Sequence, residues 1–396
     1  MRKVRSKPKV CIMTSVHQPY DIRIFYKQAR SLAAAGYDVN LIAQKQENTE
    51  EEVDGVRFIP VPKSKNRVER ISKTVWQVFS KAVKQKADIY HFHDPELLPA
   101  GIMLKLLGKK VIYDIHENVA EQIQNKQWVP CRRLISRMYR LLELTVCRLF
   151  PLVLAEASYD KLYPASWKKT VVQNFAELAL FPERSSVAKQ ANSLVYIGGV
   201  TRLRGISVVL EALHLLKQQR IDFHFDCIGP AAGEYRNELE RQCADYGLTK
   251  QVTFHGHMKA AEAYRIVQKS SIGLAVLQPD PNYFESFPTK MFEYMALRIP
   301  FITSNFPLYV KTVEATGSGV AVDPQNPAML AQTIRYMLEH PMELKEMGEK
   351  GRAAVEATYN WSREESKLLQ LYDDLLAGSV KSVNKVNKIK NLEESR

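Results

Sequence analysis

The sequence predicts an α/β protein built from two doubly wound parallel sheets in tandem. Short apolar runs alternate with stretches of helical period along residues 9–174 and again along residues 193–340. This alternation is typical of parallel strands joined by crossover helices. A polar stretch without any period, residues 181–192, separates the two series and is the expected linker. At 396 residues the chain is long enough for two domains with proper cores.

The individual elements follow from the apolar runs and from the helical spacing between them. In the first series we expect helices near 21–36, 67–86, 96–107 and 131–149, and strands at 9–14, 39–43, 56–61, 88–93, 110–116, 151–157 and 170–174. In the second series we expect helices at 206–219, 235–246, 259–269, 288–297 and 326–340, and strands at 193–199, 223–229, 251–256, 272–277, 300–304 and 319–323.

These elements give a first domain at residues 1–180 and a second domain at residues 193–360. A last helix, 361–378, is expected to cross back to the first domain. The remaining residues, 379–396, are rich in lysine and asparagine and have no apolar face, so we expect a basic disordered tail.

Composition excludes several classes of protein. The five cysteines include no C-x-x-C pair, so we expect reduced thiols in a cytoplasmic protein without a zinc cluster. No apolar run approaches the ~20 residues that span a membrane, and the basic start continues into a strand rather than a signal peptide. Residues 1–180 carry a net charge of +12 and residues 181–396 carry +1. The basic half implies an anionic partner, which is nucleic acid or an anionic membrane surface.

The stretch ESFPTKMFEYMALRIP carries the strongest functional pattern. Its two carboxylates, Glu285 and Glu293, stand eight positions apart. A helix is expected to begin between them, with Ser286 or Phe287 as its cap and Pro288 as its first residue. The N–H groups at a helix start form an anion site. Carboxylates on both sides of such a site suit a nucleotide-sugar, which has phosphate between two groups of hydroxyls. Two solvated glutamates on a surface helix are the alternative.

With this motif the chain resembles the GT-B glycosyltransferases of retaining family 4, over about residues 9–376. The resemblance implies two Rossmann-like domains that face a cleft. It implies that Glu293 binds the ribose of the nucleotide and that Glu285 lies beside the donor sugar. Backbone amides between them, at Phe287 and Thr289, are implied to contact the sugar and the phosphate.

The chain departs from the family pattern directly after Phe287. Family members usually have Gly-Leu where Pro288 and Thr289 stand here. Because proline has no N–H group, one amide contact is lost. We expect the cation of Lys290 to offset that loss.

A second motif, YIGGVTRLRGI, combines a strand, a glycine turn, two arginines and a helix start. Glycines let the backbone approach a ligand closely, and the helix start adds N–H donors. In the family, a basic residue directly before the last glycine binds the donor diphosphate, and Arg204 matches that position. The other basic residue of the family is replaced by Gly199, and Arg202 is expected to substitute for it. An arginine pair on an exposed loop is the alternative.

A third motif, YDIHEN, places His116 at the carboxyl end of a buried strand. The resemblance implies that His116 contacts the donor sugar, and Glu117 is expected to orient the ring and raise its pKa. Nearby, His93, Asp94 and Glu96 have the residue types of a metal site, but a wall of the acceptor cleft is the favoured interpretation. The chain has no Asp-x-Asp pair, so we expect no metal.

The first loop, TSVHQPYDIRIF, departs furthest from the family, in which many relatives have a Gly-Gly turn. His17, Pro19, Asp21 and Arg23 stand there instead. This departure removes the expected backbone contact with phosphate and leaves Arg23 as a candidate charge contact. Asn174 matches the asparagine that precedes the interdomain linker in the family, so the resemblance implies that it contacts the donor, although the usual Asn-Gly-Val is Asn-Phe-Ala here.

The sequence therefore favours a metal-independent retaining glycosyltransferase. It is expected to move a sugar from a nucleotide-sugar donor to a glycan or lipid-linked acceptor, such as a precursor of a cell-surface glycan. No cofactor is expected, because the nucleotide-sugar is a substrate. One alternative is a nucleotide-sugar 2-epimerase on the same fold. The other is a nucleic-acid-binding protein, but the basic stretches 63–86 and 126–148 carry few of the aromatic side chains that stack on bases.

The stretch CRRLISRMYRLLELTVCRLF suggests where the acceptor lies. It sets four arginines beside an apolar face, at Arg132, Arg133, Arg137 and Arg140, and at Leu134, Ile135, Met138, Leu141, Leu142 and Val146. A helix of this kind can lie in a bilayer interface. Together with the charge imbalance, it favours a peripheral enzyme on the cytoplasmic face of a membrane. A crossover helix packed on the sheet with a solvated basic side is the alternative.

Overall fold

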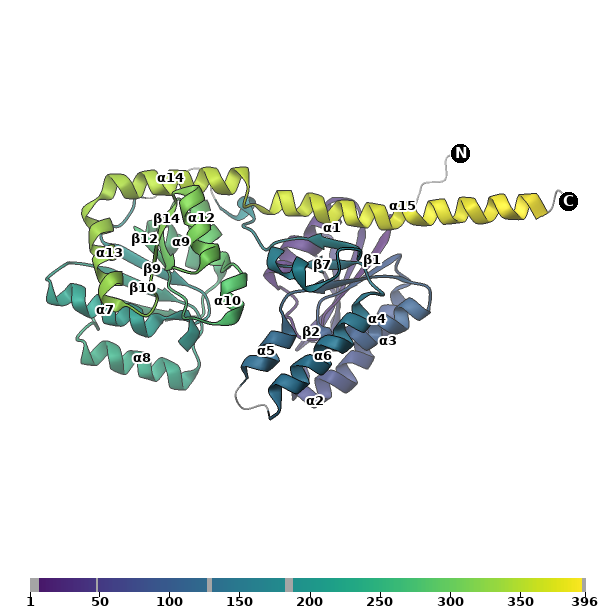
Figure 1. Cartoon of the computed structure of the whole chain (residues 1–396), viewed down its shortest axis with the longest axis horizontal. Helices are drawn as coiled ribbons and strands as arrows, with labels where there is room; N and C mark the ends of the chain where they lie inside the picture. Colours follow the sequence, from purple (N-terminus) through teal and green to yellow (C-terminus); the bar gives the residue numbers. More distant parts are fainter. Residues whose placement is uncertain (1–6, 48, 127–129, 182–187, 394–396) are drawn as a thin grey trace. The chain divides into compact units, whose positions relative to one another are not determined.

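The chain forms two compact units, which can be followed by colour in Figure 1. The computed structural model describes residues 7–47, 49–126, 130–181 and 188–393, with side chains as far as Ala377. Unit 1 consists of Met1–Asn174 and Trp361–Arg396, and unit 2 consists of Phe175–Asn360.

The division between the units falls before the predicted linker at 181–192. Phe175, Ala176 and Phe181 are buried in a core cluster of unit 2, and the ring of Phe181 packs edge-on against Tyr264 with centroids 4.9 Å apart. These apolar side chains hold the chain in unit 2 from residue 175 onward. Residues 182–187 of the predicted linker lie outside the described residues.

Unit 1 is built on an eight-stranded sheet whose strand order is β3-β4-β2-β1-β5-β6-β7-β8. Its strands are β1 (Lys9–Met13), β2 (Asp38–Lys45), β3 (Glu51–Val53), β4 (Val56–Pro62), β5 (Ile89–Phe92), β6 (Lys110–Ile115), β7 (Leu152–Leu154) and β8 (Lys169–Val171). All neighbours pair in parallel except β3 and β4. Asp54 and Gly55 join β3 to β4 with φ angles of 51° and 74°, as a tight hairpin requires.

Helices cover both faces of this sheet. The first group comprises α2 (Arg67–Glu69), η2 (Arg70–Thr74), α3 (Val75–Gln85), α4 (Leu98–Leu106), α5 (Val119–Asn125) and α6 (Arg132–Cys147). Of these, α3, α4 and α6 contribute to one core cluster. The crossovers from β4 through β5 and β6 to β7 all run the same way along the sheet, and right-handed crossovers in one direction lie on one face. The π-helix η1 (Ile22–Ala29) and α1 (Arg30–Ala34) contribute to the cluster on the opposite face.

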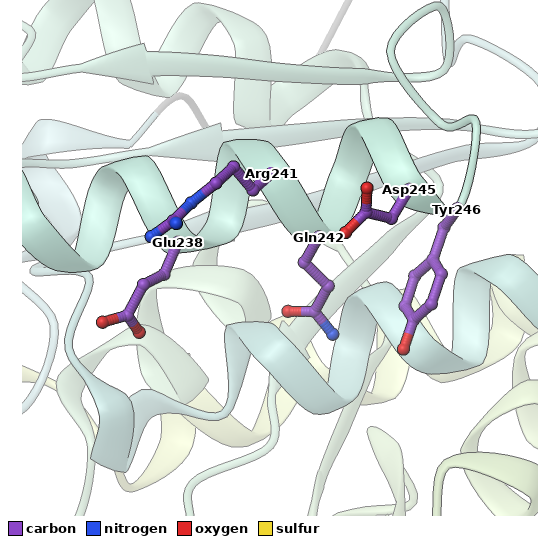
Figure 2. Close-up of a pocket in the computed structure, with 5 residues that line it drawn as sticks. All are labelled: Glu238, Arg241, Gln242, Asp245 and Tyr246. Atoms are coloured by element: carbon purple, nitrogen blue, oxygen red, sulfur yellow. The ribbon is translucent and has the colours of Figure 1, made fainter.

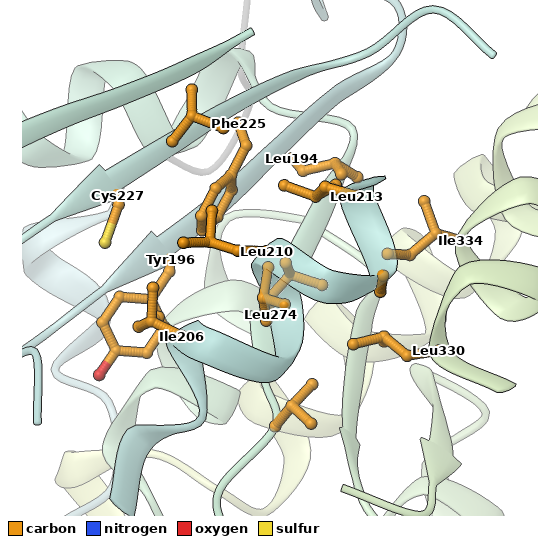
Figure 3. Packing of buried hydrophobic residues seen from close by; sticks show 14 of the residues in the cluster. Leu194, Tyr196, Ile206, Leu210, Leu213, Phe225, Cys227, Leu274, Leu330 and Ile334 are labelled. Atoms are coloured by element: carbon orange, nitrogen blue, oxygen red, sulfur yellow. The ribbon is translucent and has the colours of Figure 1, made fainter. Parts of the chain in front are cut away.

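Unit 2 repeats this plan with a six-stranded parallel sheet in the order β11-β10-β9-β12-β13-β14. Its strands are β9 (Ser193–Ile197), β10 (His224–Ile228), β11 (Val252–Gly256), β12 (Ile272–Ala275), β13 (Phe301–Ser304) and β14 (Gly319–Val322). On one face, α7 (Ile206–Gln218), α8 (Gly233–Asp245) and α13 (Pro327–Glu339) close a core of aliphatic side chains, part of which Figure 3 shows. The other helices are α9 (Ala260–Lys269), α10 (Pro281–Glu285), α11 (Thr289–Ala296), α12 (Pro307–Thr316) and α14 (Pro341–Ala357).

In each unit the direction of winding reverses at one point in the sheet. In unit 1 the reversal lies between β1 and β5, and in unit 2 it lies between β9 and β12. The carboxyl ends of the strands at such a point leave room for ligands in open α/β sheets. The sites of both units are therefore expected in the loops that follow these four strands.

The last helix, α15 (Trp361–Glu393), belongs to unit 1. Trp361 is 1% exposed and donates its indole N–H to the Ser31 hydroxyl at 2.8 Å, and Leu368, Leu371 and Tyr372 are buried in the same cluster. The backbone of 379–393 is helical, which differs from the predicted disordered tail. Once packing has fixed the first turns, each further residue adds a hydrogen bond without a new nucleus, and neither glycine nor proline interrupts the chain after Gly378.

We predict that a chain ending at Gly378 keeps the melting temperature of the full chain within about a degree, because surface changes usually cost less than ~0.5 kcal/mol. The buried residues described for α15 all precede Ala377. Differential scanning calorimetry measures the difference. In a matched chain ending at Asn360, which lacks Trp361 and Tyr372, unit 1 should lose its cooperative unfolding transition, because both side chains belong to its core. A loss of several degrees in the longer chain would show that its last residues stabilise the fold.

Candidate functional site

In unit 2 a glycine turn follows β9 at the point where the sheet reverses. Gly198 has a φ of +130°, and a Cβ added there would lie 3.3 Å from the Nζ atom of Lys290. The exposed Gly199 follows, and its carbonyl accepts a hydrogen bond from the Tyr196 hydroxyl at 2.7 Å. The turn therefore exposes backbone above Lys290, and a side chain at Gly198 would crowd that space.

Lys290 lies beneath this turn as a buried cation. The residue is 5% exposed, and its Nζ atom has no hydrogen-bond partner among the described residues. The ammonium lies 3.6 Å from the centroid of the Tyr196 ring. Burial, followed by the charge of Arg204, holds the pKa of Lys290 well below its usual range, while Glu293 opposes the shift. A buried charge without a hydrogen-bond partner is costly, so the position favours an anion that would pair with it.

The two arginines of η6 (Arg202–Arg204) have different partners. Arg204 is half-buried, with its guanidinium 5.1 Å from the centroid of the Tyr283 ring. Its charge acts on Lys290. Arg202 instead forms an ion pair with Glu238 at 2.6 Å and stacks on Tyr235. The structure thus brings Arg204 and Lys290 together, while Arg202, which was expected to replace the missing basic residue at Gly199, is engaged by α8.

A hollow on the outer side of α8 includes this partner of Arg202. Figure 2 shows its lining, which consists of Glu238, Arg241, Gln242, Asp245 and Tyr246. Its lining residues all come from α8 and its carboxyl end. Because none of them follows a strand at the reversal point, the hollow is separate from the candidate site.

The helix start predicted between the two glutamates lies one residue later than expected. Pro288, not Ser286 or Phe287, is the N-cap, with extended angles of φ −74° and ψ 120°, and α11 begins at Thr289. In the part of the chain that the structure describes, no side chain caps this start. The first N–H groups of α11 are then left for water or a ligand.

The two glutamates of the motif are both half-buried, Glu285 as the last residue of α10 and Glu293 in the middle of α11. Glu293 accepts a hydrogen bond from the hydroxyl of Tyr264, whose pKa is raised by burial and by this carboxylate. Between the glutamates, Phe287 packs its ring against Phe292 at 5.2 Å. The sequence did not identify Tyr264, which lies on α9 and is 29 positions from its partner.

In unit 1 a buried carboxylate, Asp114, organises the polar groups. It is the next-to-last residue of β6, has no exposed surface and accepts hydrogen bonds from Arg23 at 2.9 and 3.2 Å and from Gln28 at 2.6 Å. Burial alone would raise its pKa, but Arg23 and His116 hold it well below its usual range. Arg23 also donates to the Val172 carbonyl at 2.8 Å and is 4% exposed. The prediction that Arg23 contacts a ligand is therefore wrong, because its charge is paired inside unit 1.

His116 lies at the outer end of this group. Its Nε2 atom is 3.0 Å from Nδ1 of His93 and 3.7 Å from Asp114. Burial lowers the pKa of His93 to about 4, so that ring is neutral at physiological pH. Glu117, which was expected to orient His116, instead accepts a hydrogen bond from Gln122. His93 and Asp114 hold the ring.

The loop after β1 is fixed by a second buried carboxylate, Asp94. Its Oδ2 atom accepts hydrogen bonds from the Thr14 hydroxyl at 2.7 Å and from the amide of Ser15 at 2.5 Å. His17 bridges Asp94 and Asp21, at 3.4 and 3.2 Å. Burial would lower the pKa of His17, but these carboxylates raise it. The His17 ring lies 5.0 Å from His116, so unit 1 presents two histidines together.

Asn174 is the last residue of unit 1. Its side-chain oxygen accepts a hydrogen bond from the Lys27 ammonium at 2.5 Å, and its carbonyl accepts a second one at 3.2 Å. Lys27 is 4% exposed. The matched asparagine therefore orients a buried lysine of η1, and its proposed contact with a ligand stays a prediction.

The metal site by residue type, His93 with Asp94 and Glu96, does not assemble. Asp94 binds the loop after β1, and Glu96 pairs with Arg70 at 2.8 Å. Another set, His91, His93 and Asp114, does bring its ligand atoms within 4.8 Å of one another. Arg23 and Gln28 already bind Asp114 there. A metal ion would therefore have to displace them and would be repelled by the positive charge of Arg23.

Sequence reasoning did not identify Asp114, although a signal was present. KVIYDI is otherwise a strand of buried residues, and aspartate is almost never fully buried without a partner. An aspartate in such a strand, two positions before a histidine on the same face, indicates a buried polar group at the carboxyl edge of the sheet.

Taken separately, the two units offer complementary chemistry. Unit 2 presents a buried ammonium, a guanidinium and an uncapped helix start, with carboxylates on either side, which suits a ligand that carries phosphate and hydroxyls. Unit 1 presents two histidines on a charge-balanced support, which suits polar groups without charge.

Comparison with known proteins agrees with this assignment. The description "Glycosyl transferases group 1" matches residues 180–354, and "Glycosyltransferase Family 4" matches residues 23–161. A glycogen synthase of Mycobacterium tuberculosis is 22% identical over 295 residues, which are 72% of this chain and 69% of the relative.

Two solved structures show the same fold. Sucrose-phosphate synthase from Thermosynechococcus elongatus, 19% identical, gives a TM-score of 0.76 over 94% of this chain and 100% of its own. HepE of Anabaena, solved in complex with UDP-glucose and 13% identical, gives 0.70 over 92% and 99%. With both family descriptions matched in order along its length, the chain belongs to glycosyltransferase family 4, the group 1 retaining glycosyltransferases of GT-B fold.

Proposed function

We propose that unit 2 binds a UDP-sugar and that the sugar passes to an acceptor bound mainly by unit 1, without a metal ion. The observation that carries this proposal is the buried ammonium of Lys290 beneath the glycine turn, close to Arg204. Uridine is proposed as the base because HepE, which has the same fold, was solved with UDP-glucose.

In the proposed reaction the bond between the anomeric carbon and the diphosphate oxygen breaks, and its electron pair stays on the diphosphate. Lys290, Arg204 and the start of α11 would meet the growing negative charge, as fixed donors do at other leaving groups. The acceptor hydroxyl bonds to the anomeric carbon with retention, and its proton leaves with the nucleoside diphosphate. Glu293 would hold the ribose, Glu285 and His116 would lie beside the sugar, and backbone at Gly199, Phe287 and Thr289 would contact sugar or phosphate.

For the acceptor we propose a lipid-linked precursor of a cell-surface glycan, reached from the cytoplasmic side of a membrane. The support is the charge of +12 in the first 180 residues, which the paired cations of the site do not explain. None of the described helices is both long enough and apolar enough to cross a bilayer. Attachment would therefore be peripheral.

The proposed function is tested by thermal unfolding with a panel of nucleoside diphosphates and nucleotide-sugars, followed by turnover of the best ligand. A ligand that binds only the folded state stabilises it by RT ln(1 + [L]/Kd). We expect UDP and a UDP-sugar to raise the melting temperature with or without EDTA, and NMR to show retention at the anomeric carbon. Loss of turnover in EDTA with recovery in Mg²⁺ would overturn the metal-free mechanism.

We predict that Lys290→Met raises the free energy of unfolding of the unliganded protein and weakens its binding of UDP. Methionine keeps the apolar stem but removes the buried ammonium, whose desolvation is unfavourable. A charged hydrogen bond to phosphate contributes about 1.5–3 kcal/mol, so the Kd of UDP should rise about 10- to 150-fold. Unfolding with and without UDP measures both effects. The exposed Lys250, changed to methionine, is the control.

The same variant should show a defined pH dependence. The pKa of Lys290 is lowered in the folded unit, so between that lowered value and about pH 10.4 the unfolded chain binds more protons than the folded chain. Wild-type stability should therefore rise with pH relative to the variant, and the advantage of the variant should shrink as pH approaches that value. A variant that is less stable than wild type at neutral pH would contradict the proposed state of this lysine.

Changing Glu293 to glutamine should raise the donor KM about tenfold or more, with a smaller effect on kcat. Glutamine keeps the shape but loses the charge that strengthens hydrogen bonds to the ribose hydroxyls. Initial rates at varied donor concentration give both constants. Tyr264→Phe, which removes only the hydrogen-bond donor to Glu293, should give a smaller change. A donor KM equal to that of wild type would remove Glu293 from the binding site.

A further inference from the structure

Helix α6 is turned with its polar side inward. Its buried residues are Ser136, Glu143 and Cys147. Four of its apolar side chains are exposed instead, at 58% for Leu134, 63% for Met138, 69% for Leu141 and 57% for Leu142, whereas Leu144 and Val146 pack against the core. A crossover helix that only covers a sheet buries its apolar stripe against that sheet. Through Cys147, Leu144 and Val146, α6 packs on the sheet as the expected alternative has it, and Arg133 and Arg137 are exposed. Most of its apolar face nevertheless lies outside that contact.

The inward side of α6 is held by polar contacts. Glu143 is 2% exposed and pairs with Arg140 at 2.7 Å, and the Ser136 hydroxyl donates to the Ala120 carbonyl at 2.6 Å. The Arg140 guanidinium also lies 4.8 Å from the centroid of the Tyr163 ring. Arg140 thus does not belong to the outward basic group predicted from the sequence. Because these contacts fix the rotation of α6, its apolar face cannot turn inward without leaving Glu143 and Arg140 unpaired.

The neighbouring helices expose apolar side chains on the same face of the sheet. Helix α3 packs against α4, and α3, α4 and α6 share one core cluster. Their outer sides expose Trp76 at 61%, Leu106 at 83% and Leu107, directly after α4, at 56%. We call the outward surface of α3, α4 and α6 the outer layer; the labels of these helices are found together in the right half of Figure 1.

The exposed charges of the outer layer are all positive. Helices α3 and α4 contain no aspartate or glutamate, and the one carboxylate of α6 is the buried Glu143. Lys84, Lys105, Arg133 and Arg137 are exposed on these helices. An apolar surface fringed only by cations suits a partner with an apolar interior and an anionic surface.

We propose that the outer layer docks on an anionic lipid bilayer, with Leu134, Met138, Leu141 and Trp76 entering the interface and Arg133 and Arg137 contacting headgroup phosphates. A tryptophan suits this depth because its ring is apolar and its N–H is polar. A second copy of the chain fits less well, since two outer layers would set arginine against arginine. The use of such docking to the enzyme rests on the proposed function, in which the acceptor is lipid-linked. The arrangement of the apolar and basic side chains does not depend on that proposal.

The test is sedimentation of the full chain with phosphatidylcholine vesicles that contain 0–50% phosphatidylglycerol, at low and at high salt. We expect binding that grows with phosphatidylglycerol and falls with salt, because lipid charge is screened within a Debye length. Arg133→Gln with Arg137→Gln should weaken binding about thirtyfold, since each basic residue adds about 1 kcal/mol near such a surface. Leu141→Gln with Met138→Gln should weaken it at every salt concentration.

Matched controls come from unit 2. Arg241→Gln with Lys250→Gln removes two exposed cations, and Met329→Gln with Met342→Gln removes two exposed apolar side chains. Both should sediment as wild type does. Thermal unfolding of every variant with UDP reports the donor site independently.

The outcomes separate this inference from the proposed function. If wild type stays in the supernatant at every composition while UDP still stabilises it, the docking surface is overturned and the donor site stands. If vesicles bind as expected but no nucleotide stabilises the chain, the proposed function fails and the surface stands. Equal sedimentation of the outer-layer variants and wild type, or concentration-dependent dimers in light scattering that those variants abolish, would also overturn docking on a bilayer.

Discussion

An ammonium buried without a hydrogen-bond partner is the constraint on which the organisation of unit 2 depends. Lys290 can stay beneath the turn because Gly198 has no side chain to crowd it and because the face of Tyr196 gives partial compensation. Arg204 adds a second positive charge instead of a counter-charge. An unpaired charge in such a position is unfavourable in the unliganded state, and an anion would remove that cost. The turn, the uncapped start of α11 and both cations are thus consistent with one ligand that carries phosphate.

In unit 1, by contrast, the buried charged groups have partners within the unit. Asp114 is fully buried, but Arg23 and Gln28 satisfy it, and His93 and His116 lie 3.5 and 3.7 Å from its carboxylate. Lys27, also buried, binds Asn174. With these cations paired, this network has no charge left for a phosphate. It instead fixes the orientation of His116 and His17, whose exposed atoms can exchange hydrogen bonds with hydroxyl groups. The proposed division between phosphate binding in unit 2 and hydroxyl binding in unit 1 follows from which buried charges have partners.

Prediction from the sequence was most successful where the spacing of apolar residues directly reflects the geometry of strands and helices. The strands other than β3 and the two doubly wound sheets follow from the apolar period. The family was identified from the resemblance of the Glu285–Glu293 motif and its companions to a known family, and the roles of the two glutamates stay predictions. The prediction missed α5, α10, α12 and α14, of which the last three have a proline in the first turn, and it missed β3, although Asp-Gly marked the hairpin. It misplaced Arg23 and Arg140, because a sequence shows that an arginine is present and not which carboxylate it reaches across the chain. The period of α6 likewise predicts an amphipathic helix without saying which face is buried.

Part of the excess positive charge of the first half of the chain can be assigned to one surface once the paired cations are excluded. Lys290 and Arg204, which we propose bind the donor diphosphate, belong to the half of the chain with a net charge of only +1, so the proposed donor site does not account for the surplus of +12 in the first half. The buried cations of unit 1, Arg23 and Lys27, are neutralised or bound within it. Arg140 is paired with Glu143. On α3, α4 and α6 the exposed cations are Lys84, Lys105, Arg133 and Arg137, and these helices carry no exposed carboxylate. This part of the surplus therefore belongs to a surface rather than to the candidate site, and the outward apolar face on the same helices gives that surface a reason to be basic.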